Sequence, residues 1–449
     1  MATAAKTPPA EDRNAPGVHS KPFWSFKPRS DRESGDAIVA NFALHWFPAK
    51  VFKPSLDWSY SFWLGTISAA LLLLLTVSGL PLLFLYVPSV ERAYGSVKDI
   101  EWVVTFGSWI RSVHRLSAHL MVAAVFLHLV RVFLTGAYKN GAGRGQRREW
   151  NWVLGVVMLV LTLFLSFTGY LLPWDQLAFW AVTVGTNIAA AIPWVGPQVR
   201  ELMIGGRNID QATLIRFYVL HVILLPGALG ALFAYHMWRI RKDGGLARVD
   251  RVATLREKAP EEPSPTKTYT LLGVARGTAP TIRAASLEAR DLTVNAVPDL
   301  VRRAAVAVLG TFAVISVLAS LIRSPLEEAA NPLVTPNPAK APWYFLWLQE
   351  IVTDTTFTVG GFTVNGAFLG GVILPGLILL VLTAWPWLDR SPADATGVWF
   401  AKSRRRQNLV FLLAVLIVVA LTIVGTFLRG PSWQLFWPWE VWPELPTRI

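Results

Sequence analysis

Apolar residues along this chain gather into seven long runs, and a polar segment separates each run from the next. The runs cover residues 60–87, 112–135, 151–171, 213–239, 301–322, 365–387 and 408–428. Each run is long enough for a helix that crosses the roughly 30 Å hydrocarbon core of a bilayer. The pattern therefore predicts an all-α, polytopic membrane protein with seven spans.

Charge is distributed unevenly between the connections of these spans. Lys and Arg concentrate after the second, fourth and sixth runs, for example at Lys139, Arg144 and Lys402. Because basic residues accumulate in cytoplasmic loops, we expect the N-terminus inside and the C-terminus outside. The net charge of +13 would also suit a nucleic-acid-binding protein, but topology explains it without one, and we expect no nucleic acid as a partner.

The polar stretches divide the chain into four predicted segments. Residues 1–54 form a polar N-terminal extension, 55–240 hold four spans, 241–300 form a proline-punctuated cytoplasmic linker, and 301–449 hold three spans. The chain contains no cysteine. A disulfide framework, an Fe–S cluster held by this chain, a cysteine nucleophile and thioether attachment of haem are therefore excluded.

Four histidines form two pairs within the second and fourth runs. His114 and His128 are 14 residues apart, and His221 and His236 are 15 apart, so each pair spans about 21 Å along a helix. Two such helices side by side would offer one imidazole each at two depths, which suits a flat cofactor with two axial positions. We predict two non-covalent b-type haems, with His114 and His221 at the iron of the outer one, and His128 and His236 at the inner one. The alternative is that these histidines are polar residues satisfied by neighbouring helices.

His119 matches neither level, and we interpret it as a core histidine with a local partner.

Glycine spacing follows the same interval. Gly65 and Gly79 in the first run, and Gly155 and Gly169 in the third, are each 14 residues apart. Glycine allows a bulky group to approach the backbone closely. We therefore expect a four-helix haem-binding bundle in which two helices carry histidines and two leave room for the macrocycles.

Three arginines lie near the predicted ends of the haem-binding helices. Arg111 and Arg216 precede the outer histidines, and Arg131 follows His128 by three residues. A guanidinium at the membrane boundary can bind a haem propionate with two hydrogen bonds. The alternative is that these side chains extend to lipid headgroups.

Several stretches resemble cytochrome b of the quinol-oxidising bc complexes. They are RSVHRLSAHLMVAAVFLHLVRVFLTGAYK from Arg111, GYLLPWDQLAFWAVTVGTNIAAAIPWVG from Gly169, TLIRFYVLH from Thr213 and NPAKAPWYF, which ends at Phe345. The longer second histidine interval and Asp175 after Trp174 resemble the chloroplast-type b6 and subunit IV pair, here joined in one chain. The joining suggests a bacterial protein.

The resemblance implies a respiratory quinol:cytochrome c oxidoreductase in a bacterial inner membrane. Quinol, with menaquinone as a candidate, would be oxidised near the outer face, and electrons would cross the membrane through two b haems with proton translocation. A Rieske-type Fe–S protein, a cytochrome c-type subunit or soluble acceptor, and a dimeric complex are the implied partners.

Two residues depart from the family pattern. Trp63 stands near the cysteine that attaches an extra haem in the chloroplast type, so we expect no such covalent haem. Pro342 replaces the glutamate of the PEWY-type loop, the family's usual candidate for accepting a quinol proton. The remaining candidates for that role are Tyr344, Glu350, Asp354 and Asp175. We favour Glu350, with bound water as its rival, and expect Asp175 to anchor the loop.

Two other functions stay open at this point. A di-haem membrane anchor of a peripheral dehydrogenase would share the histidine bundle, but it needs neither the 173–196 loop nor three further spans. A transporter could relay protons through membrane histidines and carboxylates. Absorbance distinguishes the transporter, which would lack b-type haem bands, and outer-site inhibitors distinguish the anchor.

Overall fold

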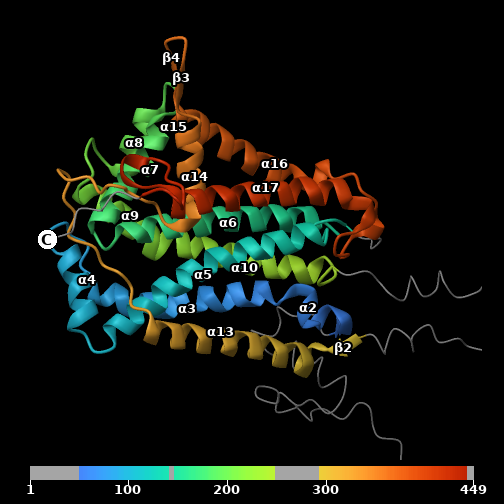
Figure 1. The fold of residues 1–449 in the computed structure, drawn as a ribbon. Coiled ribbons are helices and arrows are strands. Elements are labelled where there is room, and N and C mark those ends of the chain that lie inside the picture. The colour runs from blue at the N-terminus through green and yellow to red at the C-terminus, as the bar shows by residue number, and fades with distance from the viewer. Residues whose placement is uncertain (1–49, 141–145, 248–292, 442–449) are drawn as a thin grey trace, which may run out of the picture. The chain divides into compact units, whose positions relative to one another are not determined.

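The structure, a computed structural model, describes residues 50–140, 146–247 and 293–441 (Figure 1). Most of the predicted N-terminal extension and most of the predicted linker lie outside these residues. The chain divides into two compact units. One holds residues 1–56 and 261–304, and the other holds 57–260 and 305–449.

In the smaller unit, two short strands form an antiparallel pair. Strand β1 (Lys50–Phe52) pairs with β2 (Thr293–Asn295), and Val51 lies opposite Val294. The helical turns η2 (Lys53–Leu56) and η4 (Ala296–Leu300) follow these strands. Arg303 donates a hydrogen bond to the carbonyl oxygen of Leu56 at 2.7 Å, which ties the start of α13 (Val301–Leu321) to η2.

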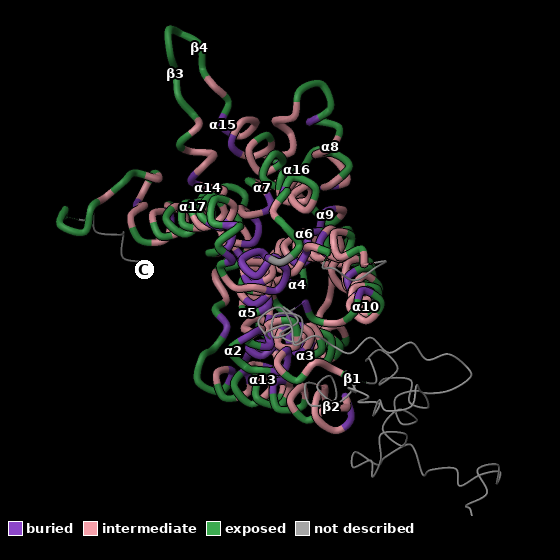
Figure 2. The backbone as a smooth tube through the Cα atoms, turned by 90° about the vertical axis from the view of Figure 1, so that its right-hand side faces the viewer, coloured by how far each residue is buried: buried purple, intermediate pink, exposed green. Residues whose placement is uncertain are grey.

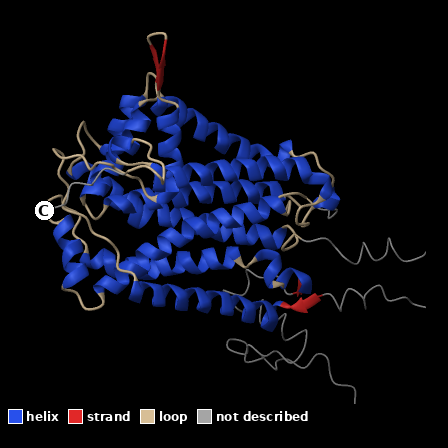
Figure 3. Ribbon diagram, viewed as in Figure 1, coloured by secondary structure: helices blue, strands red, loops and turns tan. Residues whose placement is uncertain are grey.

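Among the residues that the structure describes, seven helices are long and apolar enough to cross a membrane, as the hydrophobic pattern predicts. They are α3 (Leu64–Leu85), α5 (Gly107–Leu134), α6 (Arg148–Leu171), the continuous α9–η3–α10 (Gln211–Lys242), η4–α13 (Ala296–Leu321), α15–η5–α16 (Gly366–Leu388) and η7–α17–η8 (Lys402–Leu428). The described strands are all three residues long (Figure 3). The all-α membrane fold is therefore confirmed.

The first predicted span begins too early. Residues Trp58–Ser61 form a separate short helix, α2, and α3 begins only at Leu64. Phe62 and Trp63 between them have left-handed backbones, with φ of 48° and 52°. L-residues do not continue a right-handed helix in this conformation, so the chain turns before the membrane helix starts.

Shorter elements connect the spans of the larger unit. They are α4 (Ala93–Trp102), α7 (Gln176–Ala190), α8 (Gly196–Ile204), α14 (Trp343–Asp354) and the hairpin of β3 (Phe357–Val359) and β4 (Phe362–Val364). Asp175 caps α7 by accepting a hydrogen bond from the backbone N–H of Ala178 at 2.9 Å. This cap satisfies a donor that the first helical turn leaves unpaired.

Helices α3, α5, α6 and α10 lie side by side in the larger unit (Figure 1). Buried residues concentrate on α5, whereas α16 has none and α17 has only Asn408 (Figure 2). One apolar cluster joins Leu71 and Leu74 of α3 to Val113 and Met121 of α5. The four-helix bundle is thus the packed part of this unit, while α16 and α17 leave apolar surface for lipid or other chains.

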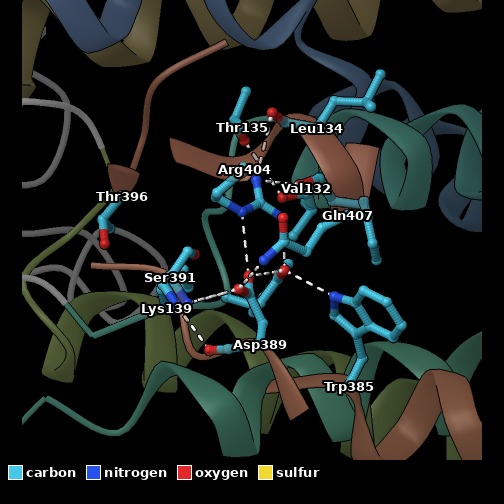
Figure 4. A network of polar contacts seen from close by, with 12 residues as sticks. Val132, Leu134, Thr135, Lys139, Trp385, Asp389, Ser391, Thr396, Arg404 and Gln407 are labelled. Atoms are coloured by element: carbon cyan, nitrogen blue, oxygen red, sulfur yellow. Dashed lines mark hydrogen bonds and ion pairs between the residues drawn. The ribbon is translucent and has the colours of Figure 1, made fainter. Parts of the chain in front are cut away.

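A buried charged network ties the end of α5 to the loop between α16 and α17 (Figure 4). The Asp389 carboxylate accepts hydrogen bonds from Arg404 Nε at 3.1 Å and from the Tyr138 hydroxyl at 2.6 Å. The Lys139 ammonium lies 3.6 Å from the same carboxylate. The side chains of Asp389 and Arg404 are both 0% exposed. Because both charges are buried and paired, the network forms a specific contact between the predicted four-span segment and the predicted three-span segment.

Candidate functional site

Each of the four singled-out glycines faces one of the four paired histidines. A Cβ built on Gly79 would lie 3.2 Å from His114, and one on Gly65 would lie 3.3 Å from His128. Likewise, Gly169 faces His221 and Gly155 faces His236. The bundle therefore has two levels. We call the one with His114, His221, Gly79 and Gly169 the outer level, and the one with His128, His236, Gly65 and Gly155 the inner level.

At the outer level, the ring centroids of His114 and His221 lie 6.2 Å apart. Two imidazoles on opposite sides of one metal, with metal–nitrogen bonds of about 2 Å, place their ring centroids about 6 Å apart. At the inner level, His128 and His236 are near enough to interact electrostatically. The outer spacing fits one metal ion between two axial histidines.

Hydrogen bonds orient the outer imidazoles. His221 Nδ1 lies 3.0 Å from the carbonyl oxygen of Leu165, which can only accept a hydrogen bond. The Ser78 hydroxyl donates to the Leu74 carbonyl at 2.6 Å and lies 3.0 Å from His114 Nδ1, so it can accept from that nitrogen. Both rings therefore carry their proton on Nδ1 and keep the Nε2 lone pair for a metal, as is usual for metal-binding histidines.

A π-helical segment explains why the second histidine interval is one residue longer. Segment η3 (Leu220–Leu224) contains His221, and the N–H of Leu225 bonds to the carbonyl of Leu220, five residues earlier. Pro226 follows and has no N–H to donate to the helix ladder. A π turn accommodates one extra residue. The interval of 15 residues between His221 and His236 can thus match the 14 between His114 and His128.

The inner level holds buried donors that lack protein partners. Arg131 Nη2 and Trp63 Nε1 are buried and make no hydrogen bond within the described part of the chain. The Arg131 guanidinium also lies over the Tyr60 ring, 4.7 Å from its centroid. Unpaired buried donors are costly, so these atoms fit an acceptor that the polypeptide does not supply, such as a carboxylate of a bound cofactor.

The other two predicted propionate arginines have different surroundings. Arg111 is buried, pairs with Glu101 at 2.8 Å, and donates to the carbonyl oxygens of Ser324 and Pro325. It therefore fastens the segment after α13 to α5. Arg216 is exposed, and its guanidinium covers Gly205, which has a left-handed φ of 85°.

A cavity of about 330 Å³ opens from the outer level. His114, His221, Gly79 and Gly169 contribute to its wall at one end. Tyr86, Tyr170, Asp175, Glu327 and Tyr344 also line it, and most of the remaining wall is apolar. An elongated apolar molecule with a few polar atoms is the kind of ligand that such a pocket takes.

Burial shifts the pKa values of Asp175 and Tyr344, which both line this cavity. Burial raises the pKa of Asp175, and hydrogen bonds from the backbone N–H groups of Ala178 and Glu327 partly offset that effect. Burial also raises the pKa of Tyr344 to about 12, against a hydrogen bond with Ser166 and the nearby Arg115 guanidinium. Tyr344 therefore stays protonated at neutral pH and acts as a hydrogen-bonding group.

The favoured proton acceptor, Glu350, lies elsewhere. Its side chain is 0% exposed, and Arg429 holds both of its carboxylate oxygens, with Nη2 to Oε2 at 2.8 Å. Glu350 is not among the residues that line the described cavity. Asp354 is 54% exposed and lies 3.4 Å from the same guanidinium. The contacts of Glu350 are those of a structural ion pair, so they argue against direct contact with a ligand in this cavity.

Arg115 and His119 line the cavity, although the sequence did not predict a part for either of them in its chemistry. Arg115 directly follows His114, and its position beside a predicted ligand was the available signal. His119 was expected to be a core histidine, and it does have a local partner. Trp343 Nε1 donates to its Nδ1 at 3.1 Å. However, His119 also lines the cavity and packs on Tyr344, with ring centroids 5.8 Å apart.

Comparisons with known proteins find similarity in both halves of the chain. Residues 50–244 match the family profile described as cytochrome b/b6/petB, and residues 329–437 match that of cytochrome b (C-terminal)/b6/petD. Cytochrome b6 of Synechococcus elongatus is 45% identical over 181 residues, which is 40% of this chain and 81% of the relative. Cytochrome b6 of Synechocystis is 40% identical over 227 residues, or 51% of this chain and 95% of the relative.

A solved structure has a similar fold along most of the chain. A chain of a hyperthermophilic respiratory Complex III superimposes with a TM-score of 0.61 and 24% identity. The match covers 82% of this chain and 84% of that one. At 24% identity, the match shows that the two chains have a similar fold.

Proposed function

Because the chain belongs to the cytochrome b/b6 family, we propose that it is the di-haem cytochrome b subunit of a bc-type quinol:cytochrome c oxidoreductase. One observation carries the proposal. A single cavity is lined by the outer histidines His114 and His221 and, further along, by Asp175 and Tyr344. A quinol bound in that cavity would lie next to the redox cofactor that would take up one of its two electrons.

The residues of the bundle fit two b-type haems. His114 and His221 would bind one iron, and His128 and His236 the other, with a glycine beside each imidazole. Arg131 Nη2 would bind an inner propionate, while Arg111 and Arg216 are weaker candidates because of their protein contacts and exposure. When bound, the haems would supply the one-electron chemistry that connects the two membrane faces.

In the outer cavity, the chain's own residues bind and orient quinol. The apolar wall excludes water from the ring and its isoprenoid tail. Tyr344 offers a hydroxyl that stays protonated, and the Asp175 cap on α7 keeps the loop before it against the cavity. The two protons released when quinol is oxidised would leave toward the outer face through bound water or side chains of this wall, because Pro342 cannot accept a proton.

Other chains must complete the reaction. The chain has no cysteine, so a Rieske-type Fe–S protein is the expected acceptor of one electron, followed by a cytochrome c-type subunit or soluble carrier. The distribution of basic loops supports a bacterial cytoplasmic membrane with the N-terminus inside. A dimeric complex and menaquinone as the quinone remain part of the proposal.

Purification of the complex from its native membrane tests this function. We expect low-spin b-type absorbance for two haems, reduction of both by a naphthoquinol, and inhibition by compounds that block outer-site quinol oxidation. His128→Leu should remove only the inner haem, or prevent assembly of the complex. A di-haem anchor would resist those inhibitors, and absence of b-type bands would contradict the proposal.

A further inference from the structure

We propose that His119 is a quinone-binding residue of the outer cavity, where its Nε2–H donates a hydrogen bond to a ring oxygen of the bound quinone. This inference rests on the proposed function and adds a specific contact to it. His119 lines the cavity and packs on Tyr344 at the start of α14.

The partner of His119 fixes its tautomer. An indole N–H can only donate, so His119 Nδ1 must be the acceptor of the 3.1 Å bond from Trp343. A neutral imidazole that accepts at Nδ1 carries its proton on Nε2. Nε2 makes no hydrogen bond with the residues that the structure describes. His119 therefore has one donor left.

Several other polar groups of the cavity wall are already engaged. The Tyr86 hydroxyl donates to the Leu172 carbonyl at 2.7 Å. The two carboxylate oxygens of Asp175 accept backbone N–H groups of Ala178 and Glu327. A quinone carbonyl needs a donor, and the Nε2–H of His119 can supply it without breaking an existing contact.

His119 also contacts the two residues that follow Pro342, which stands where the PEWY-type loop has a glutamate. Pro342 caps α14, and the next two residues, Trp343 and Tyr344, are the ones that contact the His119 ring. A polar side chain from α5 therefore lies beside the place where this chain has lost a carboxylate. The His119 imidazole and a glutamate carboxylate differ chemically. The imidazole with its proton on Nε2 donates a hydrogen bond, whereas the carboxylate accepts one.

A set of variants in the intact complex tests this contact, with 2,3-dimethyl-1,4-naphthoquinone and its quinol as probes. His119→Leu removes the donor, whereas His119→Gln retains an N–H group near the position of Nε2. We expect KM for the naphthoquinol to rise about three- to tenfold in His119→Leu, the range for one neutral hydrogen bond. In His119→Gln it should stay within about twofold of wild type.

The infrared carbonyl band of the bound naphthoquinone provides a second measurement that does not depend on turnover. Loss of a hydrogen bond strengthens the C=O bond, so the band should move to higher wavenumber in His119→Leu and remain near its wild-type position in His119→Gln. The haem absorbance of both variants should match wild type, which controls for folding.

The outcomes are distinguishable. An unchanged KM and carbonyl band in His119→Leu would overturn the role of His119 while leaving the proposed function intact. Equal losses in His119→Leu and His119→Gln would show that the ring only packs, and would also overturn it. If wild type binds naphthoquinone with a shifted carbonyl band but its quinol reduces no haem, the proposed function fails and the binding contact stands.

Discussion

Gly169 of α6 lies so close to His221 that any side chain there would collide with the imidazole. A Cβ built on Gly169 would lie 2.9 Å from both ring nitrogens of His221, and closer still to Cε1. The corresponding Cβ on Gly155 would lie 3.9 Å from His236, which is ordinary van der Waals contact. Gly155 and Gly169 form one of the glycine pairs with a 14-residue interval. Of these two, only Gly169 has no space for an added Cβ atom.

This difference predicts unequal effects of the same substitution. Gly169→Ala should displace the His221 ring, at an overpacking cost of roughly 1–3 kcal/mol, and reduce the haem content of the outer level. Gly155→Ala should leave the inner level almost unchanged. Haem content by the pyridine haemochrome assay, together with a redox titration that resolves the two haems, measures both effects.

Gly155→Ala is the matched control, since it adds the same methyl group to the same helix. Retention of both haems in Gly169→Ala, with wild-type spectra, would mean that His221 has room to move and that Gly169 serves only helix packing. Gly155→Leu and Gly169→Leu should both lower haem occupancy, because a leucine exceeds the space at either position.

The sequence alone predicts the parts of this fold that depend on local pattern. Seven apolar runs predict seven helices, and the intervals of 14 or 15 residues between histidines, with 14 between glycines, predict two levels. Which side chains line the outer cavity depends on contacts between distant segments, such as His119 with Trp343 on α14. The ion pair of Glu350 with Arg429 could not be predicted for the same reason.

The buried Asp389–Arg404 pair should contribute strongly to the stability of the complex. Burial alone would raise the pKa of Asp389, but hydrogen bonds from Ser391 and Tyr138 and the Lys139 ammonium outweigh it and hold that pKa well below its ordinary value. Arg404→Met would leave Lys139, at 3.6 Å, as the remaining cation beside the carboxylate among the described residues. We expect a loss of about 3–5 kcal/mol, seen as a lower thermal midpoint or as failure of the complex to assemble.

Arg405→Met is the control, because Arg405 is the adjacent residue and is exposed. Its effect should stay within about 0.5 kcal/mol. If Arg404→Met is as stable as Arg405→Met, the network in Figure 4 does not hold the two halves together.

The raised pKa of Asp175 predicts a pH-dependent contribution to stability. Burial favours its neutral form, so the stability that it contributes is complete below its unfolded pKa of about 3.9 and is lost as pH rises through the higher folded value. Asp175→Asn cannot titrate but can still cap α7. We expect the thermal midpoint of wild type to fall relative to Asp175→Asn as pH rises above about 4.

Thermal midpoints of both proteins, measured between about pH 4 and pH 7, check this expectation. Asp175→Ala is the control for the helix cap. Its free energy of unfolding should be about 1 kcal/mol lower than that of Asp175→Asn across the whole pH range. A constant difference between wild type and Asp175→Asn would mean that the pKa of Asp175 is not raised.

The role of proton acceptor, which the sequence suggested for Glu350, can be tested by substitution. Both of its carboxylate oxygens accept hydrogen bonds from Arg429, and the side chain is fully buried. Glu350→Gln removes the charge that pairs with this guanidinium, although Asp354 at 3.4 Å remains as a partial partner. We therefore expect a stability loss of about 3 kcal/mol, at the lower end for a broken buried pair. The complex that survives should keep the wild-type KM and pH profile of quinol oxidation.

Asp354→Asn provides the comparison for Glu350→Gln, because Asp354 contacts the same arginine from an exposed position. Exposed ion pairs contribute little, so its stability should change by less than about 1 kcal/mol. A shifted pH profile in Glu350→Gln, with thermal stability like that of Asp354→Asn, would mean that Glu350 accepts a quinol proton after all. The pair with Arg429 would then have to open during turnover. Because both carboxylate oxygens and the guanidinium are held in the folded state, the structural role is the one that the contacts favour.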